Sequence, residues 1–165
     1  MLDRRTGEVP STGIIFSADI AGSSKSKGSL RNVAKRGRTA HLVEQVEGSE
    51  DWKKTLIKAF HRKVRLGDGT NPALTLPGYP YDDAVKVIVV FYFPKPVNSS
   101  LDYPSTRTYY DLDKLQRNLG DALEQGHVLK DDARIIEWSA QKRFAYPEGF
   151  VGLIVQVIDA RMIDA

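Results

Sequence analysis

The stretch from Tyr109 to Asp132 limits the possible folds most, because it joins a clear helical pattern to an unusually dense set of acids. At about 100° per residue, its apolar side chains fall on one face roughly 100° wide, which is typical of a helix packed on a core. The pattern predicts a helix over residues 112–125 that ends at Gly126. The apolar face consists of Leu112, Leu115, Leu119, Ala122 and Leu123.

Carboxylates flank this helix on both sides and run along it. Asp111 stands where an N-cap belongs, so we expect its carboxylate to accept N–H groups of the first turn. Asp113, Arg117 and Asp121 follow at i, i+4 and i+8, which predicts a ridge of alternating charge. Two further acids follow the helix at residues 131–132. Spacing alone permits two interpretations: caps and solvated ion pairs, or a functional cluster of acids.

The order of these motifs resembles the RusA family of Holliday junction resolvases. The resemblance is strong over residues 109–143, and the first hundred residues share only the order of elements. It implies an endonuclease that uses a divalent metal to hydrolyse phosphodiesters in branched DNA, typically of phage or prophage origin and acting in recombination and repair. It also implies a symmetric homodimer. The matching residues are Asp111-Leu112-Asp113, Arg117, Asp121-Ala122-Leu123, Asp131-Asp132, Ile135-Ile136 and Lys142.

Carried over by position, the resemblance makes Asp111, Asp113 and Asp132 the catalytic acids that bind metal. Carboxylates about 5 Å apart repel one another by roughly 3 kcal/mol per pair at an effective dielectric near 20, so a cation is needed among them. Mg²⁺ or Mn²⁺ suits such oxygen ligands. Arg117 stands in the position of a functional lysine of the family, and its permanent charge predicts contact with phosphate or with charge that develops during cleavage.

The resemblance also assigns supporting roles. It implies that Lys142 contacts the DNA backbone. Asp121 and Asp131 also match the family, and we assign Asp121 to orienting Arg117 and Asp131 to a turn or to support of the metal ligands. Lys114, which stands where the family usually has asparagine, is a further candidate for DNA contact. The basic, proline-containing motif at the N-terminus of family members is replaced here by ADIAGSSKSKGSLR.

A basic segment occupies residues 25–38, with six cations and no acid. Such a segment attracts polyanions, and each phosphate that it neutralises releases counterions, so DNA binding through it would depend on salt. The alternative is a solvated loop that contacts nothing. The cations are Lys25, Lys27, Arg31, Lys35, Arg36 and Arg38.

Composition narrows the remaining classes. The chain has no cysteine and three histidines, so disulfides and thiolate zinc sites are excluded and a bound metal is expected on oxygen ligands. The net charge of +3 says little about nucleic acid. No apolar run approaches the roughly 18 residues of a membrane span, and the start lacks the hydrophobic region of a signal peptide. We therefore expect a cytosolic protein without a membrane partner.

The 165 residues predict one domain over 1–165, with residues 1–12 as a flexible lead-in. The element order ββαβαββ predicts an α+β fold, a two-layer domain with a mixed sheet and helices packed on it. The resemblance implies the same architecture. The predicted strands are 13–20, 39–43, 84–93, 133–144 and 151–158. We expect 39–43 to pair with the first strand, 84–93 to be central and covered on both faces, and the last two strands to form a hairpin. A helix is predicted over about 50–65, with Ser49 as its N-cap.

The sequence therefore leads to one hypothesis and two rivals. The hypothesis is a Mg²⁺- or Mn²⁺-dependent endonuclease acting on branched DNA, with Holliday junctions as the first candidate substrate. A flap or replication-fork nuclease is the rival of the same class. A non-catalytic DNA-binding protein, in which the acids are only caps and ion pairs, is the rival of another class.

Overall fold

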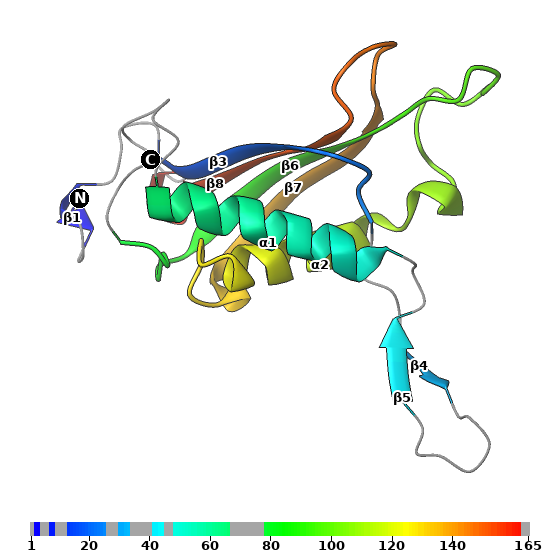
Figure 1. Ribbon diagram of the computed structural model, residues 1–165. Coiled ribbons are helices and arrows are strands. Elements are labelled where there is room, and N and C mark those ends of the chain that lie inside the picture. Colours follow the sequence, from blue (N-terminus) through cyan, green and yellow to red (C-terminus); the bar gives the residue numbers. More distant parts are fainter. Residues whose placement is uncertain are drawn as a thin grey trace.

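The computed structural model describes residues 2–3, 7–8, 13–25, 30–33, 41–44, 48–66 and 78–162. A mixed sheet of four strands forms one layer, and two helices cover one of its faces (Figure 1). The α+β fold predicted from the sequence is confirmed, although the predicted order of elements was only approximate. The strands are β3 (Ile14–Ala21), β6 (Val85–Phe93), β7 (Ile135–Phe144) and β8 (Gly152–Asp159), in the order β3-β8-β6-β7, and the helices are α1 (Ser49–Leu66) and α2 (Leu112–Gln125).

Strand β6 lies inside the sheet, antiparallel to β8 and parallel to β7. The predicted hairpin of 133–144 with 151–158 is therefore wrong, because β6 separates these two strands. Strand β6 is apolar at nearly every position, so it buries the most apolar surface when a strand lies on each side of it. Helix α2 carries the chain back to the end of the sheet where β6 begins, so β7 starts there and runs parallel to β6.

Alternate residues of β6 form the centre of the core. Val85, Val87, Val89, Phe91 and Phe93 are buried on the face that the helices cover. The residues between them are only half-buried on the opposite face, so the prediction that β6 is covered on both faces holds fully for one face alone. The partners in the core include Leu56 and Phe60 of α1 and Leu115, Leu119 and Leu123 of α2.

Two small sheets lie outside this layer. Strands β4 (Leu30–Val33) and β5 (His41–Glu44) pair antiparallel with each other and project away from the main sheet in Figure 1. The prediction that residues 39–43 pair with the first strand is therefore wrong: β8 pairs with β3 along its length, and β5 finds its partner nearby in the chain, where loop closure costs least entropy. Within the predicted lead-in, the described residues form β1 (Leu2–Asp3) and β2 (Gly7–Glu8).

The ends of both helices differ in detail from the predicted caps. The backbone N–H of Trp52 donates to the carbonyl of Gly48 (3.0 Å), so Ser49 is the first residue of α1 and not its cap. At α2, Asp111 occupies the N-cap position, but its carboxylate makes no capping hydrogen bond within the described structure.

Helix α2 ends in a Schellman motif. The N–H of Val128 donates to the carbonyl of Leu123 (2.9 Å) and that of His127 to Glu124 (3.0 Å). The left-handed residue is His127 (φ 64°), whereas Gly126 keeps φ −80°, which corrects the prediction that Gly126 is the residue beyond the cap. Glycine is needed there because a Cβ would lie 2.9 Å from the Cβ of Phe60 on α1.

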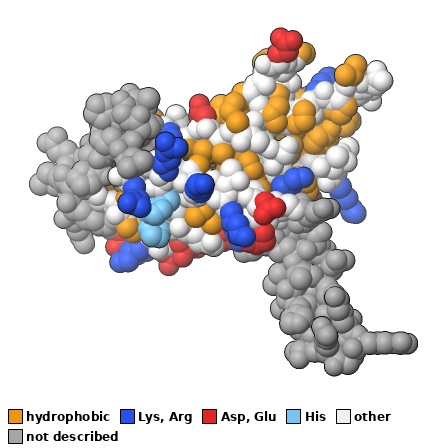
Figure 2. Space-filling model, in the orientation of Figure 1, with side chains coloured by type: hydrophobic (Ala, Val, Ile, Leu, Met, Phe, Trp, Pro, Cys, Tyr) orange, Lys and Arg blue, Asp and Glu red, His pale blue; other side chains and the backbone are white. Residues whose placement is uncertain are grey.

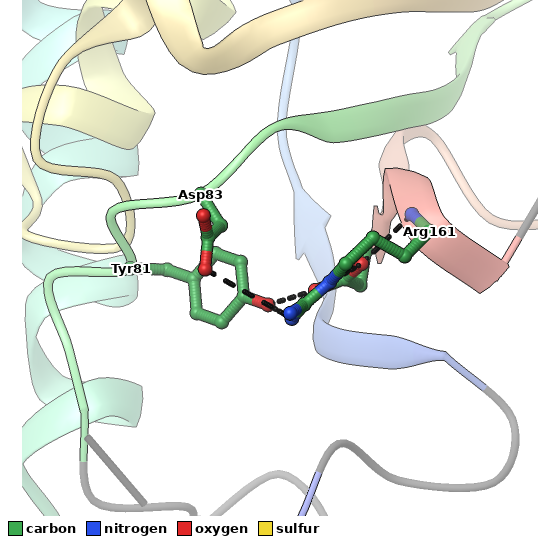
Figure 3. A network of polar contacts seen from close by, with 4 residues as sticks. Tyr81, Asp83 and Arg161 are labelled. Atoms are coloured by element: carbon green, nitrogen blue, oxygen red, sulfur yellow. Dashed lines mark hydrogen bonds and ion pairs between the residues drawn. The ribbon is translucent and has the colours of Figure 1, made fainter. Parts of the chain in front are cut away.

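A buried polar network fixes the far end of β8 (Figure 3). Asp159 is fully buried, and its carboxylate accepts hydrogen bonds from the Tyr81 hydroxyl and from the guanidinium of Arg161 (2.9 and 2.5 Å). Burial raises the pKa of Asp159, but the hydrogen bonds from Arg161 and Tyr81 outweigh it and hold that pKa below its usual value. Burial and the bond to Asp159 raise the pKa of Tyr81.

Replacing Asp159 with Asn should lower the free energy of unfolding at pH 7 by about 3 kcal/mol. The reason is that Arg161 loses the buried carboxylate with which it is paired. The native carboxyl has the lower pKa, so its contribution is present above the unfolded pKa of about 3.9 and is lost as pH falls through the native value. Urea unfolding at pH 7 and pH 3 measures both effects.

The exposed Asp102→Asn variant is the control and should unfold like the wild type at both pH values. An Asp159→Asn protein as stable as wild type at pH 7 would contradict the assignment of this network as a structural anchor.

Candidate functional site

An open pocket of about 440 Å³ lies between the outer face of α2 and the chain that follows it. The far wall is the short 3₁₀ helix η3 (Asp132–Arg134) and the first residues of β7. Acidic, basic and aromatic side chains share this pocket. They are Asp113, Gln116, Arg117, Asp121, Asp132, Ile135 and Trp138, together with Gly120.

Gly120 forms the floor of the pocket because it has no side chain. Asp113, Arg117 and Asp121 come from successive turns of α2 and stand around it, within about 80° of one another on the helix. A Cβ on Gly120 would lie 3.8 Å from Cζ2 of Trp138, 3.9 Å from Cδ1 of Ile135 and 4.0 Å from Cβ of Asp132. The small residue thus leaves space between the helix and η3.

Asp132 belongs to a second group of acids beside the pocket. One carboxylate oxygen each from Glu124, Asp131 and Asp132 lies within 4.8 Å of the others. Asp131 accepts a hydrogen bond from the N–H of Ala133 (2.8 Å) and caps η3, and Glu124 accepts one from the N–H of Asp132 (3.4 Å). Both acids therefore help to shape the turn that presents Asp132.

Sequence reasoning missed Glu124. A signal for it was present, because Glu124 lies eleven residues after Asp113, only about 20° away on the helix.

Asp111 lies outside the residues that line the pocket in the described structure. Its carboxylate is 3.3 Å from Nζ of Lys114 and close to Lys142, whose Nζ donates to the carbonyl of Tyr110 (2.8 Å). Burial lowers the pKa of Lys142, and the charge of Asp111 opposes this. Positions two apart on a helix point about 200° apart, so Asp111 and Asp113 begin on different sides.

Arg117 and Asp113 form an ion pair of 3.2 Å on the exposed face of α2. Their side chains are 68% and 61% exposed, and exposed pairs of this kind contribute at most about 1 kcal/mol. The guanidinium can therefore leave Asp113 at little cost when a stronger anion enters the pocket.

Lys25, the first residue of the predicted basic segment, lies next to the start of α2. Its ammonium is 5.8 Å from the centre of the Tyr110 ring, and its carbonyl accepts a hydrogen bond from Asn118 (3.0 Å). The basic segment therefore starts beside Tyr110, the residue before Asp111. Its other predicted DNA-binding residues, Lys27, Lys35, Arg36 and Arg38, lie outside the described residues, and Arg31 is described only as a backbone position in β4.

The acids around the pocket fit a hard divalent cation. They offer only carboxylate oxygens, they are partly or fully exposed, and they leave space for water and for an anionic ligand. Nitrogen and sulfur ligands do not line this pocket in the described chain, so the set suits Mg²⁺ or Mn²⁺ better than zinc.

A comparison with protein families decides the class. The family model described as Endodeoxyribonuclease RusA matches residues 33–157, which is most of the chain. The chain belongs to the RusA endodeoxyribonuclease family. The match includes α2, η3 and β7, so the pocket lies within the part of the chain that defines the family.

A search of curated proteins found no match. Within the described ranges, no helix has both the length and the hydropathy that a membrane span requires.

Replacing Gly120 with Ala should raise the free energy of unfolding by about 0.5–1 kcal/mol, because glycine inside a helix costs that much relative to alanine. The new Cβ meets neighbours only at ordinary contact distances. Gly120→Leu should instead fill the pocket and reduce DNA cleavage. Urea unfolding and a nicking assay measure the two effects.

Gly126→Ala is the matched control on the same helix. It should destabilise the protein, because its Cβ would lie 2.8 Å from the carbonyl oxygen of Ala122. Full cleavage activity in Gly120→Leu would show that the pocket does not receive the substrate.

Proposed function

We propose that this RusA family member is a Mg²⁺-dependent endonuclease that cuts phosphodiester bonds in branched DNA, with the four-way junction as its substrate. One observation carries the proposal. Asp113, Asp132 and Arg117 lie around one open pocket in the part of the chain that matches the family. Acids that can hold a metal and a cation that can hold a phosphate thus occupy the same place.

Asp113 and Asp132 are the metal ligands that the pocket brings together, and Asp111 is the third acid of the proposed set. The ion pair of Asp111 with Lys114 is exposed, at 58% and 36% of the two side chains, so a divalent cation competes with it easily. When bound, the metal would polarise a phosphate oxygen and ease formation of hydroxide from water.

Arg117 is the cationic residue among the described side chains that line the pocket. Its guanidinium stays protonated at any relevant pH, so it binds and orients phosphate but does not transfer a proton. Asp113 holds it in place before DNA arrives. Because the pair with Asp113 is exposed and weak, the guanidinium can turn to a phosphate in the pocket, where it would stabilise charge that develops during cleavage.

Lys25 supports the approach of DNA from the side of Tyr110 and Asp111. Figure 2 shows further Lys and Arg side chains over α1, with acids gathered near its N-terminal end. Lys142 contributes differently, because its ammonium is bonded to the carbonyl of Tyr110 and steadies the start of α2.

A second copy of the chain is the proposed partner. The sheet face opposite α1 and α2 carries half-buried apolar residues on its two inner strands, and none of the described helices covers it (Figure 1). A two-fold dimer through this face would present two pockets to a four-way junction and so permit paired nicks. The residues are Ile88, Val90 and Tyr92 of β6 and Ile154 and Ile158 of β8.

Asp113→Asn and Asp132→Asn should each reduce Mg²⁺-dependent cleavage of a four-way junction by at least about a hundredfold, because each removes a metal ligand. Junction binding in EDTA should persist, since neither acid contacts phosphate without metal. Gel assays with junction, flap and linear duplex substrates, with and without Mg²⁺, measure both quantities and the substrate preference.

Glu124→Gln is the control, because it keeps the hydrogen-bond acceptor for the N–H of Asp132 and removes one charge. It should retain most activity. Loss of activity in Glu124→Gln with normal activity in Asp113→Asn would move the metal to the group of Glu124, Asp131 and Asp132. Preference for the flap over the junction would contradict the proposed substrate.

Val90→Glu should shift the protein from dimer to monomer, because it places a charge on the uncovered face of the sheet. Light scattering coupled to size exclusion measures the mass. Val97→Glu, at a fully exposed loop position, is the control and should remain dimeric. A wild-type protein that is monomeric at micromolar concentration would remove the dimer from the proposal.

A further inference from the structure

The segment before β6 lies against the turn that carries the acids 131–132. The N–H of Tyr81 donates to the carbonyl of Val128 (2.8 Å), and the N–H of Lys130 donates back to the carbonyl of Tyr81 (2.9 Å). These bonds form an isolated parallel bridge between Tyr81 and Leu129. The backbone thus brings Asp82 to the flank of the candidate metal site.

The carboxylate of Asp82 binds the two cations that stand on either side of those acids. Its Oδ1 accepts hydrogen bonds from Nε (3.0 Å) and Nη2 (2.8 Å) of Arg134, and its Oδ2 accepts one from Nζ of Lys130 (3.2 Å). The Asp82 side chain is 24% exposed, less than either partner. Its two oxygens therefore fasten both ends of the short stretch 130–134.

The residues on both sides of Asp82 are themselves held by contacts with the end of β8. Its neighbour Tyr81 donates to the buried Asp159, and its other neighbour Asp83 lies 3.9 Å from Arg161 (Figure 3). A continuous path of polar contacts thus runs from the end of β8 through residues 81–83 to Lys130 and Arg134. Asp132 lies between these two cations in the chain, so its position depends on that path.

We infer that Asp82 is a positioning residue for the metal site, an inference that rests on the proposed function. It acts in two ways through its partners. It holds the turn so that the carboxylate of Asp132 faces the pocket across from Asp113. It also engages the charges of Arg134 and Lys130, which would otherwise pair with the adjacent Asp131 and Asp132 and compete with a divalent cation.

Calorimetric titration with Mn²⁺ measures the metal affinity of Asp82→Asn directly, and its dissociation constant should rise. A nicking assay measures the Mg²⁺ concentration that gives half-maximal junction cleavage by the same variant. We expect this concentration to rise about tenfold or more, as happens when groups that orient metal ligands are removed, with junction binding in EDTA unchanged. Asp82→Glu keeps the charge and should recover most of the metal affinity. Asp83→Asn is the matched control one residue away. It loses only the long and exposed contact with Arg161 (3.9 Å) and leaves the contacts of Tyr81 and Asp82 intact, so it should bind Mg²⁺ like wild type.

Arg134→Gln provides an independent variant in case Asp82→Asn folds poorly. It removes the main partner of Asp82, and with it one of the two competing charges, but leaves the Tyr81 bridge intact. A rise in the half-saturating Mg²⁺ concentration in this variant would therefore report the loss of the positioning contact alone, and we expect such a rise. Unchanged metal dependence in either folded variant would overturn the inference. Absence of Mg²⁺-dependent cleavage in the wild type would instead overturn the proposed function, so the two failures are distinguishable.

Discussion

The burial of one face of α2 in the core, beside α1 and under the sheet, determines where the site residues on this helix lie. Leu115, Leu119 and Leu123 are almost fully buried in the core, so the opposite face of the helix must point outwards. That outer face carries Asp113, Arg117 and Asp121, and the next strand, β7, begins beside it. The pocket is therefore a consequence of how the helix packs on the sheet, and a rotation of α2 would dismantle it.

The local pattern of α2 was enough to predict its bounds and its charged ridge, because both follow from the spacing of residues along one helix. The sheet order was not predictable in the same way. The strands β7 and β8 are adjacent in sequence and joined by a short turn, which favours a hairpin, but β6 takes the place between them. The order of the strands depends on the burial of β6 between strands that are distant in sequence, and a short sequence pattern does not indicate such contacts.

The site was predicted in part for the same reason. Asp113, Arg117, Asp121 and Asp132 meet in one pocket, whereas Asp111 faces Lys114 and Lys142. The roles of Glu124 and Asp82 depend on the turn after α2 and on the segment before β6, which are distant in sequence. The cation nearest to Asp82 in the sequence that follows it is Lys86, which pairs with Glu137, so only the fold reveals that the partners of Asp82 are Arg134 and Lys130.

Opposite charges are arranged around the acids so that their repulsion is relieved without closing the pocket. Asp82 engages the cations of the turn, and Lys142 is bonded to the start of α2. Among the cations that the structure describes, Arg117 is the one that lines the pocket, and its pair with Asp113 is exposed and weak. This division leaves the carboxylates of Asp113 and Asp132 with a net negative field, which is the condition for binding a hard divalent ion.

The most direct test of this account is a crystal structure of the wild-type protein soaked in Mn²⁺, with the metal located by its anomalous scattering. The account predicts a peak in the pocket within about 2.2 Å of carboxylate oxygens of both Asp113 and Asp132. A peak held only by Glu124 and Asp131, or a pocket that stays without metal at millimolar Mn²⁺, would contradict it.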